Sequence, residues 1–98
     1  MVKGATQEEM KMNAVDLRKQ IATSKATLEA YRLYGQFVVD AINAFTRLDE
    51  VLADPSEENV AEGLEIATEL NRQLGSYRGY VPQVANTVDG VLKWLQEK

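Results

Sequence analysis

The chain contains no histidine and no cysteine, and these two absences exclude several kinds of site. A chain without cysteine forms no disulfide, holds no metal through thiolates and has no cysteine nucleophile. A chain without histidine lacks the usual general base near neutral pH, the commonest transition-metal ligand and the His-dependent catalytic triads. We therefore expect a protein that is not an enzyme and that has no metal site and no cofactor.

The sequence also lacks long apolar runs and a surplus of basic residues. No stretch approaches the roughly 18 apolar residues of a membrane span, and the first residues, MVKGATQEEM, lack the apolar run of a signal peptide. These features favour a soluble, cytoplasmic protein with no membrane partner. The formal net charge is -4, whereas proteins that bind nucleic acid through its phosphates usually carry an excess of lysine and arginine. Nucleic acid is therefore not expected as a partner.

The residues that are present favour a single helical domain. Of the 98 residues, 45% are hydrophobic and 27% are charged, which is too apolar a composition for a disordered chain. Its content of leucine, alanine, glutamate, glutamine, lysine and arginine favours helix. A chain of this length supports one core. We expect one all-α domain over residues 1–98, with residues 1–5 disordered.

The first predicted helix is long. The segment TQEE, residues 6–9, predicts an N-terminal capping box, and no strong helix breaker follows until the segment DPSEE. Apolar residues alternate steps of four and three over residues 10–52, which is a heptad pattern. A continuous helix over 6–53 is predicted. Ser24 is polar and Gly35 costs about 1 kcal/mol in a helix interior, so each favours a bend or break.

Two shorter helices are predicted after it. The segment DPSEE predicts a restart, with Asp54 as the N-cap and Pro55 in the first helical position, and the helix covers about 55–74. Gly75 follows where a glycine typically closes a helix. The last predicted helix covers about 81–97, and its apolar stripe consists of Tyr77, Val81, Val84, Val88, Val91 and Leu95.

These helices predict an antiparallel hairpin or bundle of three helices, or of four if the first one breaks near Ser24. A continuous first helix would be roughly 70 Å long, whereas the later two would be roughly 30 Å and 25 Å and would cover about half of it. An uncovered apolar stripe usually marks an interface. We therefore predict a homo-oligomer, with a dimer favoured, whose interface consists of Met10, Ala14, Leu17, Ile21 and Leu28.

An aromatic cluster lies in the segment AYRLYGQF, residues 30–37. Tyr31, Tyr34 and Phe37 fall on adjoining inner faces of the predicted helix, and the main interpretation places them in the core. The alternative is a gap beside these rings at Gly35, into which a partner helix or an aromatic ligand would fit.

The segment LGSYRGYVP, residues 74–82, is predicted to be a structural turn whose tyrosines close one end of the bundle. It matches neither of the glycine-rich nucleotide-binding patterns. The alternative is a site for a small anion or nucleotide, because arginine offers a planar fork for phosphate and tyrosine rings stack on bases. The residues that would form this site are Arg72, Tyr77, Arg78 and Tyr80, with Lys25 from a second subunit.

Two functional hypotheses follow from these patterns. The first is a non-enzymatic protein-binding module of the adaptor, chaperone or inhibitor type, which self-associates through its first helix and presents a helical surface to another protein. The second is a protein that sequesters a small anion or nucleotide at the arginine and tyrosine turn, residues 72–80.

Overall fold

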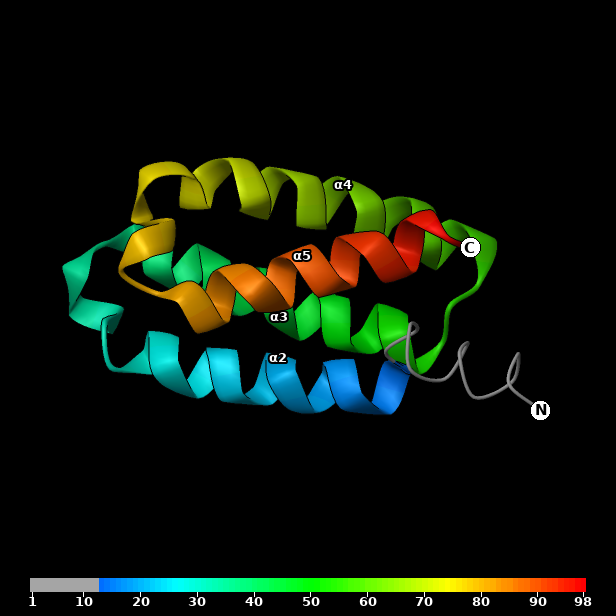
Figure 1. Cartoon of the computed structure of the whole chain (residues 1–98), viewed down its shortest axis with the longest axis horizontal. Coiled ribbons are helices and arrows are strands. Elements are labelled where there is room, and N and C mark those ends of the chain that lie inside the picture. The colour runs from blue at the N-terminus through cyan, green and yellow to red at the C-terminus, as the bar shows by residue number, and fades with distance from the viewer. Residues whose placement is uncertain (1–12) are drawn as a thin grey trace, which may run out of the picture.

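A computed structural model describes residues 13–98, and the secondary structure in this part of the chain consists of helices and their connections, with no β-strand (Figure 1). The predicted all-α class is therefore confirmed. The capping box at residues 6–9 and the disorder of residues 1–5 lie outside the described residues. The described elements, in chain order, are α2 (Ala14–Glu29), η1 (Arg32–Tyr34), α3 (Gln36–Ala53), α4 (Glu57–Leu74), η2 (Gly75–Gly79) and α5 (Pro82–Gln96), where η1 and η2 are short 3-10 helices.

The chain reverses direction between α2 and α3, at residues 30–35, and a continuous helix over 6–53 is not formed. Gly35 has φ +156, a conformation that side chains rarely adopt, so the reversal depends on glycine. Ser24, the other predicted break point, lies inside α2. Its hydroxyl donates a hydrogen bond to Thr87 Oγ1 on α5 at 2.9 Å, so this polar side chain is satisfied in the core without a break.

The four described helices pack as a bundle in which each helix contacts two neighbours. α2 and α4 lie diagonally opposite each other, and each packs against both α3 and α5. Both 3-10 helices lie at the same end of the bundle, on the left in Figure 1. We call this end, which carries η1 and η2, the turn end. The opposite end carries the connection from α3 to α4 and the C-terminus.

The core runs along the bundle axis and is built mainly from leucine, valine and Phe45. Three residues of the predicted interface belong to it. Leu17, Ile21 and Leu28 of α2 are buried within the single chain, and Ala14 is half-buried against the same core. Met10 lies outside the described residues. The predicted mismatch between one long helix and two short ones is absent among the described helices. α2 and α3 are 16 and 18 residues long, and α4 and α5 are 18 and 15 residues long.

The start of α4 differs from the prediction, whereas the position of its end agrees. Ser56 is the N-cap of α4, and its hydroxyl accepts a hydrogen bond from the Asn59 amide at 3.2 Å. Asp54 instead ends α3, and Pro55 lies in the connection. At the other end of α4, Gly75 follows the last residue as predicted and has a positive φ of 33°, but its ψ of -112° lies outside the left-handed helical region expected of a C-terminal glycine. None of the described helices has the length and apolar character that crossing a membrane requires.

Candidate binding pocket at the turn end

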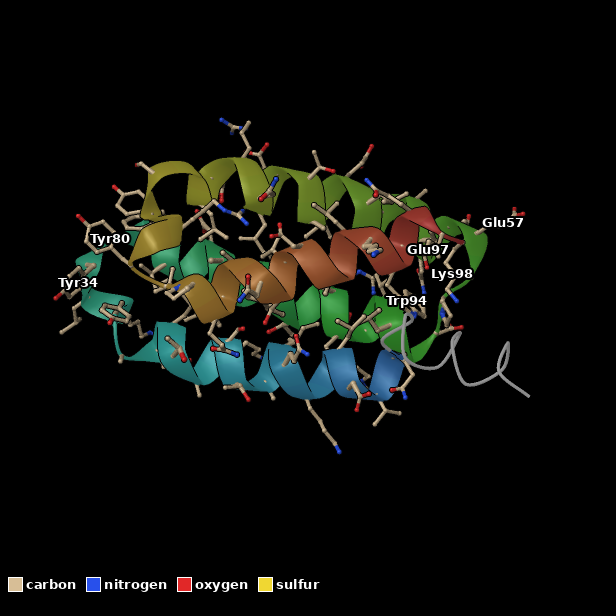
Figure 2. All side chains as sticks on the ribbon, viewed as in Figure 1. Tyr34, Glu57, Tyr80, Trp94, Glu97 and Lys98 are labelled. Carbon is tan, nitrogen blue, oxygen red and sulfur yellow. The ribbon has the colours of Figure 1, made fainter. Side chains whose placement is uncertain are left out.

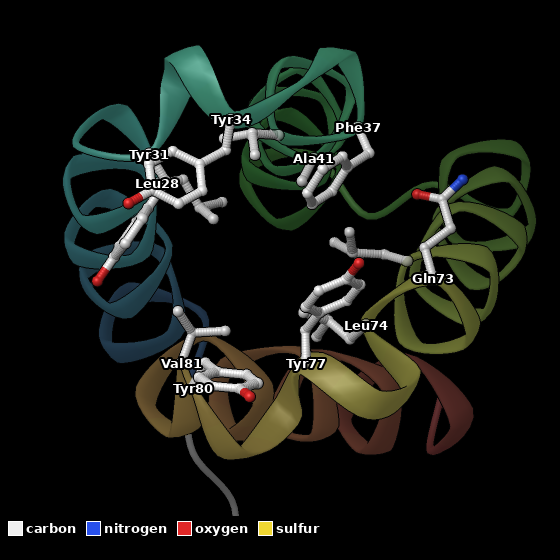
Figure 3. Close-up of a pocket in the computed structure, with 12 residues that line it drawn as sticks. Leu28, Tyr31, Tyr34, Phe37, Ala41, Gln73, Leu74, Tyr77, Tyr80 and Val81 are labelled. Atoms are coloured by element: carbon white, nitrogen blue, oxygen red, sulfur yellow. The ribbon is translucent and has the colours of Figure 1, made fainter.

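A cavity of about 470 Å³ opens at the turn end, between the four helices and the two 3-10 turns (Figure 3). All four tyrosines of the sequence line it. Its deeper wall is aliphatic and its mouth is aromatic. The lining residues are Leu28, Tyr31, Tyr34, Phe37, Val38, Ala41, Leu70, Gln73, Leu74, Tyr77, Tyr80 and Val81.

The tyrosines reach the cavity because the two turns have the same local structure. Each turn contains the pattern Tyr-Arg-x-Tyr, at residues 31–34 and 77–80. In each, the backbone N–H of the second tyrosine donates to the carbonyl of the first at 2.9 Å. A 3-10 turn places residues three apart above one another, so each turn directs its two rings to one side.

Two contacts between rings border the cavity, and one of them joins elements that are far apart in the sequence. The rings of Phe37 and Tyr77 are stacked, with centroids 5.5 Å apart, and this pair connects α3 to η2. The rings of Tyr31 and Tyr34 meet edge to face at 5.4 Å. Both arrangements are preferred geometries for aromatic pairs. The mouth of the cavity is therefore formed by two ring pairs, each in a favourable contact of its own.

Much of this aromatic surface is in contact with solvent. Tyr34 is 75% exposed and Tyr80 is 80% exposed, and Leu33 at the tip of η1 is 99% exposed. Of the seven large apolar side chains that are exposed in residues 13–98, all but Val15 belong to the turn end (Figure 2). Exposed apolar surface concentrated at one place is typical of interaction sites, so the turn end is the candidate site among the described residues.

The two arginines beside the second turn are paired with other side chains. Among residues 13–98, none of those that line the cavity carries a charge. Arg78 donates to Asn71 Oδ1 at 2.5 Å and to Asp89 Oδ2 at 2.6 Å. Arg72 donates to both carboxylate oxygens of Glu69, and these hydrogen bonds raise the pKa of Arg72 and lower that of Glu69.

The predicted anion site is therefore only partly assembled. Tyr77 and Tyr80 line the cavity, but Arg72, Arg78 and Lys25 are not among its lining residues. Both arginines already have acidic or amide partners on the outside of the bundle. A phosphate at the cavity would have to displace these partners. In residues 13–98, no group of three acidic side chains is arranged to hold a metal ion.

The aromatic cluster at residues 30–37 does not lie in the core, because the chain reverses there. Tyr31, Tyr34 and Phe37 are 39%, 75% and 48% exposed, so their placement in the core was wrong. The alternative, a gap beside these rings, agrees with the cavity that they line. A sequence signal was present: the pattern Leu-x2-Tyr-Arg-x-Tyr-x3-Val occurs twice, at residues 28–38 and 74–84. The exposed residue Leu33 occupies a variable position of this pattern, so the pattern did not identify it.

No protein-family model, curated protein or solved structure matches this chain, so the pocket is interpreted from its own residues and geometry.

Proposed function

We propose that the chain is a small protein-binding module, of the adaptor, chaperone or inhibitor type, whose partner docks at the turn end. The observation that carries this proposal is the cavity with its exposed aromatic rim. Pockets of 300–1,000 Å³ with mostly apolar walls and few polar groups are typical binding sites. The core of this bundle leaves the cavity open rather than filling it, and that favours an occupant.

A protein partner accounts for the rim better than a small molecule does. Leu33 does not line the cavity, yet it is almost fully exposed beside it. Tyr34 and Tyr80 also present most of their surface outward. A small molecule inside the cavity would leave these side chains in water, whereas a protein surface would cover them. Tyrosine is enriched at protein interfaces because it buries a large rigid ring at low entropic cost.

The proposal is for binding rather than catalysis. It also places the docking surface at the turn end instead of on the first predicted helix. Gln73 and four phenol groups are the polar lining groups of the cavity, and they form no acid and base pair with a nucleophile. Leu17 and Ile21 are buried in one chain and offer no surface for self-association. The pairing of Arg72 and Arg78 with partners of their own favours the protein-binding hypothesis over anion sequestration.

The proposal is tested with a library of random peptides displayed on phage and selected on the immobilised protein. Selected peptides are synthesised, and their affinities are measured by calorimetry. Ala41→Phe fills the cavity from its wall, and Tyr34→Ala removes part of the rim. We expect either change to weaken binding by about tenfold or more, as removal of a central interface contact does.

Val15→Ser is the matched control, because Val15 is an exposed apolar residue on the far half of α2. It should leave peptide affinity unchanged. Circular dichroism confirms that each variant is folded. The proposal is wrong if no peptide is enriched, or if the selected peptides bind all three variants as well as they bind the original chain.

A further inference from the structure

We propose that the group held in the cavity is a tryptophan side chain of the partner. This inference rests on the proposed function, since it specifies what the partner inserts at the turn end. Four properties of the cavity support it: its volume, its lack of acidic and basic side chains, its aromatic walls and a directed amide acceptor at its rim. Each one excludes a different class of occupant.

The volume suits a large side chain. A cavity of about 150 Å³ holds one benzene ring, and this cavity is about 470 Å³. A single small aliphatic side chain would leave most of it empty, which forfeits contacts with the walls. An indole together with its own backbone fills it far better.

The electrostatics exclude a charged side chain. None of the described lining residues is an aspartate, glutamate, lysine or arginine, and the arginines of the two turns already have acidic partners. Arg32 bonds to Glu29 at 2.8 Å, and Arg78 bonds to Asp89 at 2.6 Å. A carboxylate or an ammonium group entering the cavity would lose its water without gaining an opposite charge, which is strongly unfavourable.

The walls favour an aromatic group over an aliphatic one of similar size. Two ring pairs border the mouth, and Figure 3 shows Tyr31 and Tyr77 from different elements on different sides of the opening. A flat ring entering between them meets ring faces and edges, and such contacts stabilise aromatic pairs beyond the burial of surface. An aliphatic chain gains only the burial.

Gln73 provides a directed hydrogen-bond acceptor at the rim. Its amide nitrogen donates to Glu69 Oε2 at 3.1 Å, and this bond to a carboxylate fixes which way the amide faces. The amide oxygen is therefore turned toward the cavity, as Figure 3 shows. An acceptor in this position selects a neutral ring that carries a donor, which among protein side chains means the phenol of tyrosine or the indole of tryptophan, and the larger indole fills more of the cavity.

The test uses N-acetyl-tryptophanamide as the probe, with amide resonances of the protein followed by NMR. We expect a dissociation constant on the order of 1 mM, with shifts at the turn end that disappear in Ala41→Phe. Two comparison probes sharpen the result. The leucine analogue should bind more weakly, and so should the benzothienylalanine analogue, which has the shape of tryptophan but no N–H.

Gln73→Leu isolates the hydrogen bond. It should weaken the tryptophan probe by about fivefold, the usual effect of one neutral hydrogen bond, and leave the benzothienyl probe unchanged. A structural effect of the substitution would instead weaken both probes equally. Gln83→Leu, a surface change on α5 outside the cavity lining, is the control.

Other outcomes separate this inference from the proposed function. If the leucine probe binds as well as the tryptophan probe, or if selected peptides fill the cavity without a tryptophan, the inference fails and the docking site stands. If the tryptophan probe binds but no peptide does, the docking proposal fails. If the same resonances shift with protein concentration in the absence of any probe, and do so equally in Trp94→Phe, a second copy of the chain is the occupant and the tryptophan assignment is overturned.

Discussion

The two phenylalanines of the chain lie on the same helix in opposite circumstances. Phe45, in the middle of α3, is fully buried in the bundle core. Phe37, near the start of α3, is 48% exposed and stacks on Tyr77 at the mouth of the cavity. The middle of the bundle is closed by side chains from all four described helices, whereas the turn end is left open. One helix therefore contributes to the core in its middle and to the lining of the cavity at its start.

The contrast extends to the glycines. Gly63 lies where α4 approaches both α3 and α5, and a Cβ there would be 3.0 Å from Val51 Cγ1 and 3.1 Å from Leu95 Cδ1. Gly79 in η2 has no heavy atom within 4 Å of the position of a Cβ. Glycine therefore allows close packing in the body of the bundle, and at the turn end it leaves open space beside the tyrosines.

The largest effect should come from shortening Phe45. We expect Phe45→Ala to lower the free energy of unfolding by about 3–5 kcal/mol, because it removes a fully buried ring and leaves a void. Phe37→Ala should cost about 1 kcal/mol, since half of that ring is already in water. Urea unfolding followed by circular dichroism measures both. Equal losses would contradict the division between a closed middle and an open end.

Substitutions at Gly63 and Gly79 should show the same contrast in stability between the middle of the bundle and the turn end. We expect Gly63→Val to cost about 1–3 kcal/mol, because the added side chain must displace Val51 or Leu95. Gly79→Ala should change the free energy of unfolding by less than about 1 kcal/mol, and stabilisation is the expected sign, because alanine restricts the unfolded chain. Thermal unfolding of both variants checks this comparison. A large loss in Gly79→Ala would mean that the turn end is packed as closely as the middle.

The sequence predicted the faces of the helices better than it predicted their direction. Within the predicted stripe of the last helix, Val84, Val88, Val91 and Leu95 are buried as their spacing indicated, whereas Tyr77 lies in η2 and is 49% exposed. The apolar pattern of residues 10–52 also identified the buried residues Leu17 and Phe45. An apolar repeat indicates which side of a helix is covered. In this chain the repeat keeps the same spacing through residues 30–35, where the chain reverses direction. The pattern therefore gave no sign that residues 30–35 turn the chain back.

The candidate site depended on that reversal, which is why the sequence located only part of it. Tyr77 and Tyr80 were assigned to a turn at the end of the bundle, and the structure places them there. Tyr31 and Tyr34 were assigned to the core, because a continuous helix would have buried them. The positive φ of Gly35 brings the second tyrosine pair to the same end. The exposure of Leu33 depends on tertiary structure and has no local signature.

A rim substitution should separate binding from stability. We expect the double variant Tyr34→Ala, Tyr80→Ala to change the free energy of unfolding by no more than about 0.5 kcal/mol, because both rings are mostly exposed. The same variant should lose most of the affinity for peptides selected on the turn end. Calorimetric titration and urea unfolding of one preparation give both values. A loss of stability equal to that of Phe45→Ala would assign these tyrosines to the fold rather than to recognition.

The smallest expected effect concerns pH and contrasts an ion pair between helices with one inside a helix. Arg47 of α3 donates to both carboxylate oxygens of Glu62 on α4, at 2.8 and 2.7 Å, and these hydrogen bonds lower the pKa of Glu62 below its ordinary 4.5. A carboxyl group with a lowered pKa in the folded state adds stability above its ordinary pKa, and this contribution is lost as the pH falls through the folded value. Acid should therefore destabilise the bundle partly through this pair.

Arg47→Met should reduce that acid sensitivity, measured as the difference between the urea midpoints at pH 7 and pH 3. Arg72→Met is the control. Arg72 and Glu69 lie three residues apart on α4, and the hydrogen bond from Arg72 lowers the pKa of Glu69 through a local contact. A local pair also forms in part when α4 is not packed, so its pKa differs less between the folded and unfolded chains. If Arg72→Met changed the acid sensitivity as much as Arg47→Met does, the ion pair that joins α3 to α4 would have no special role in holding the closed part of the bundle together.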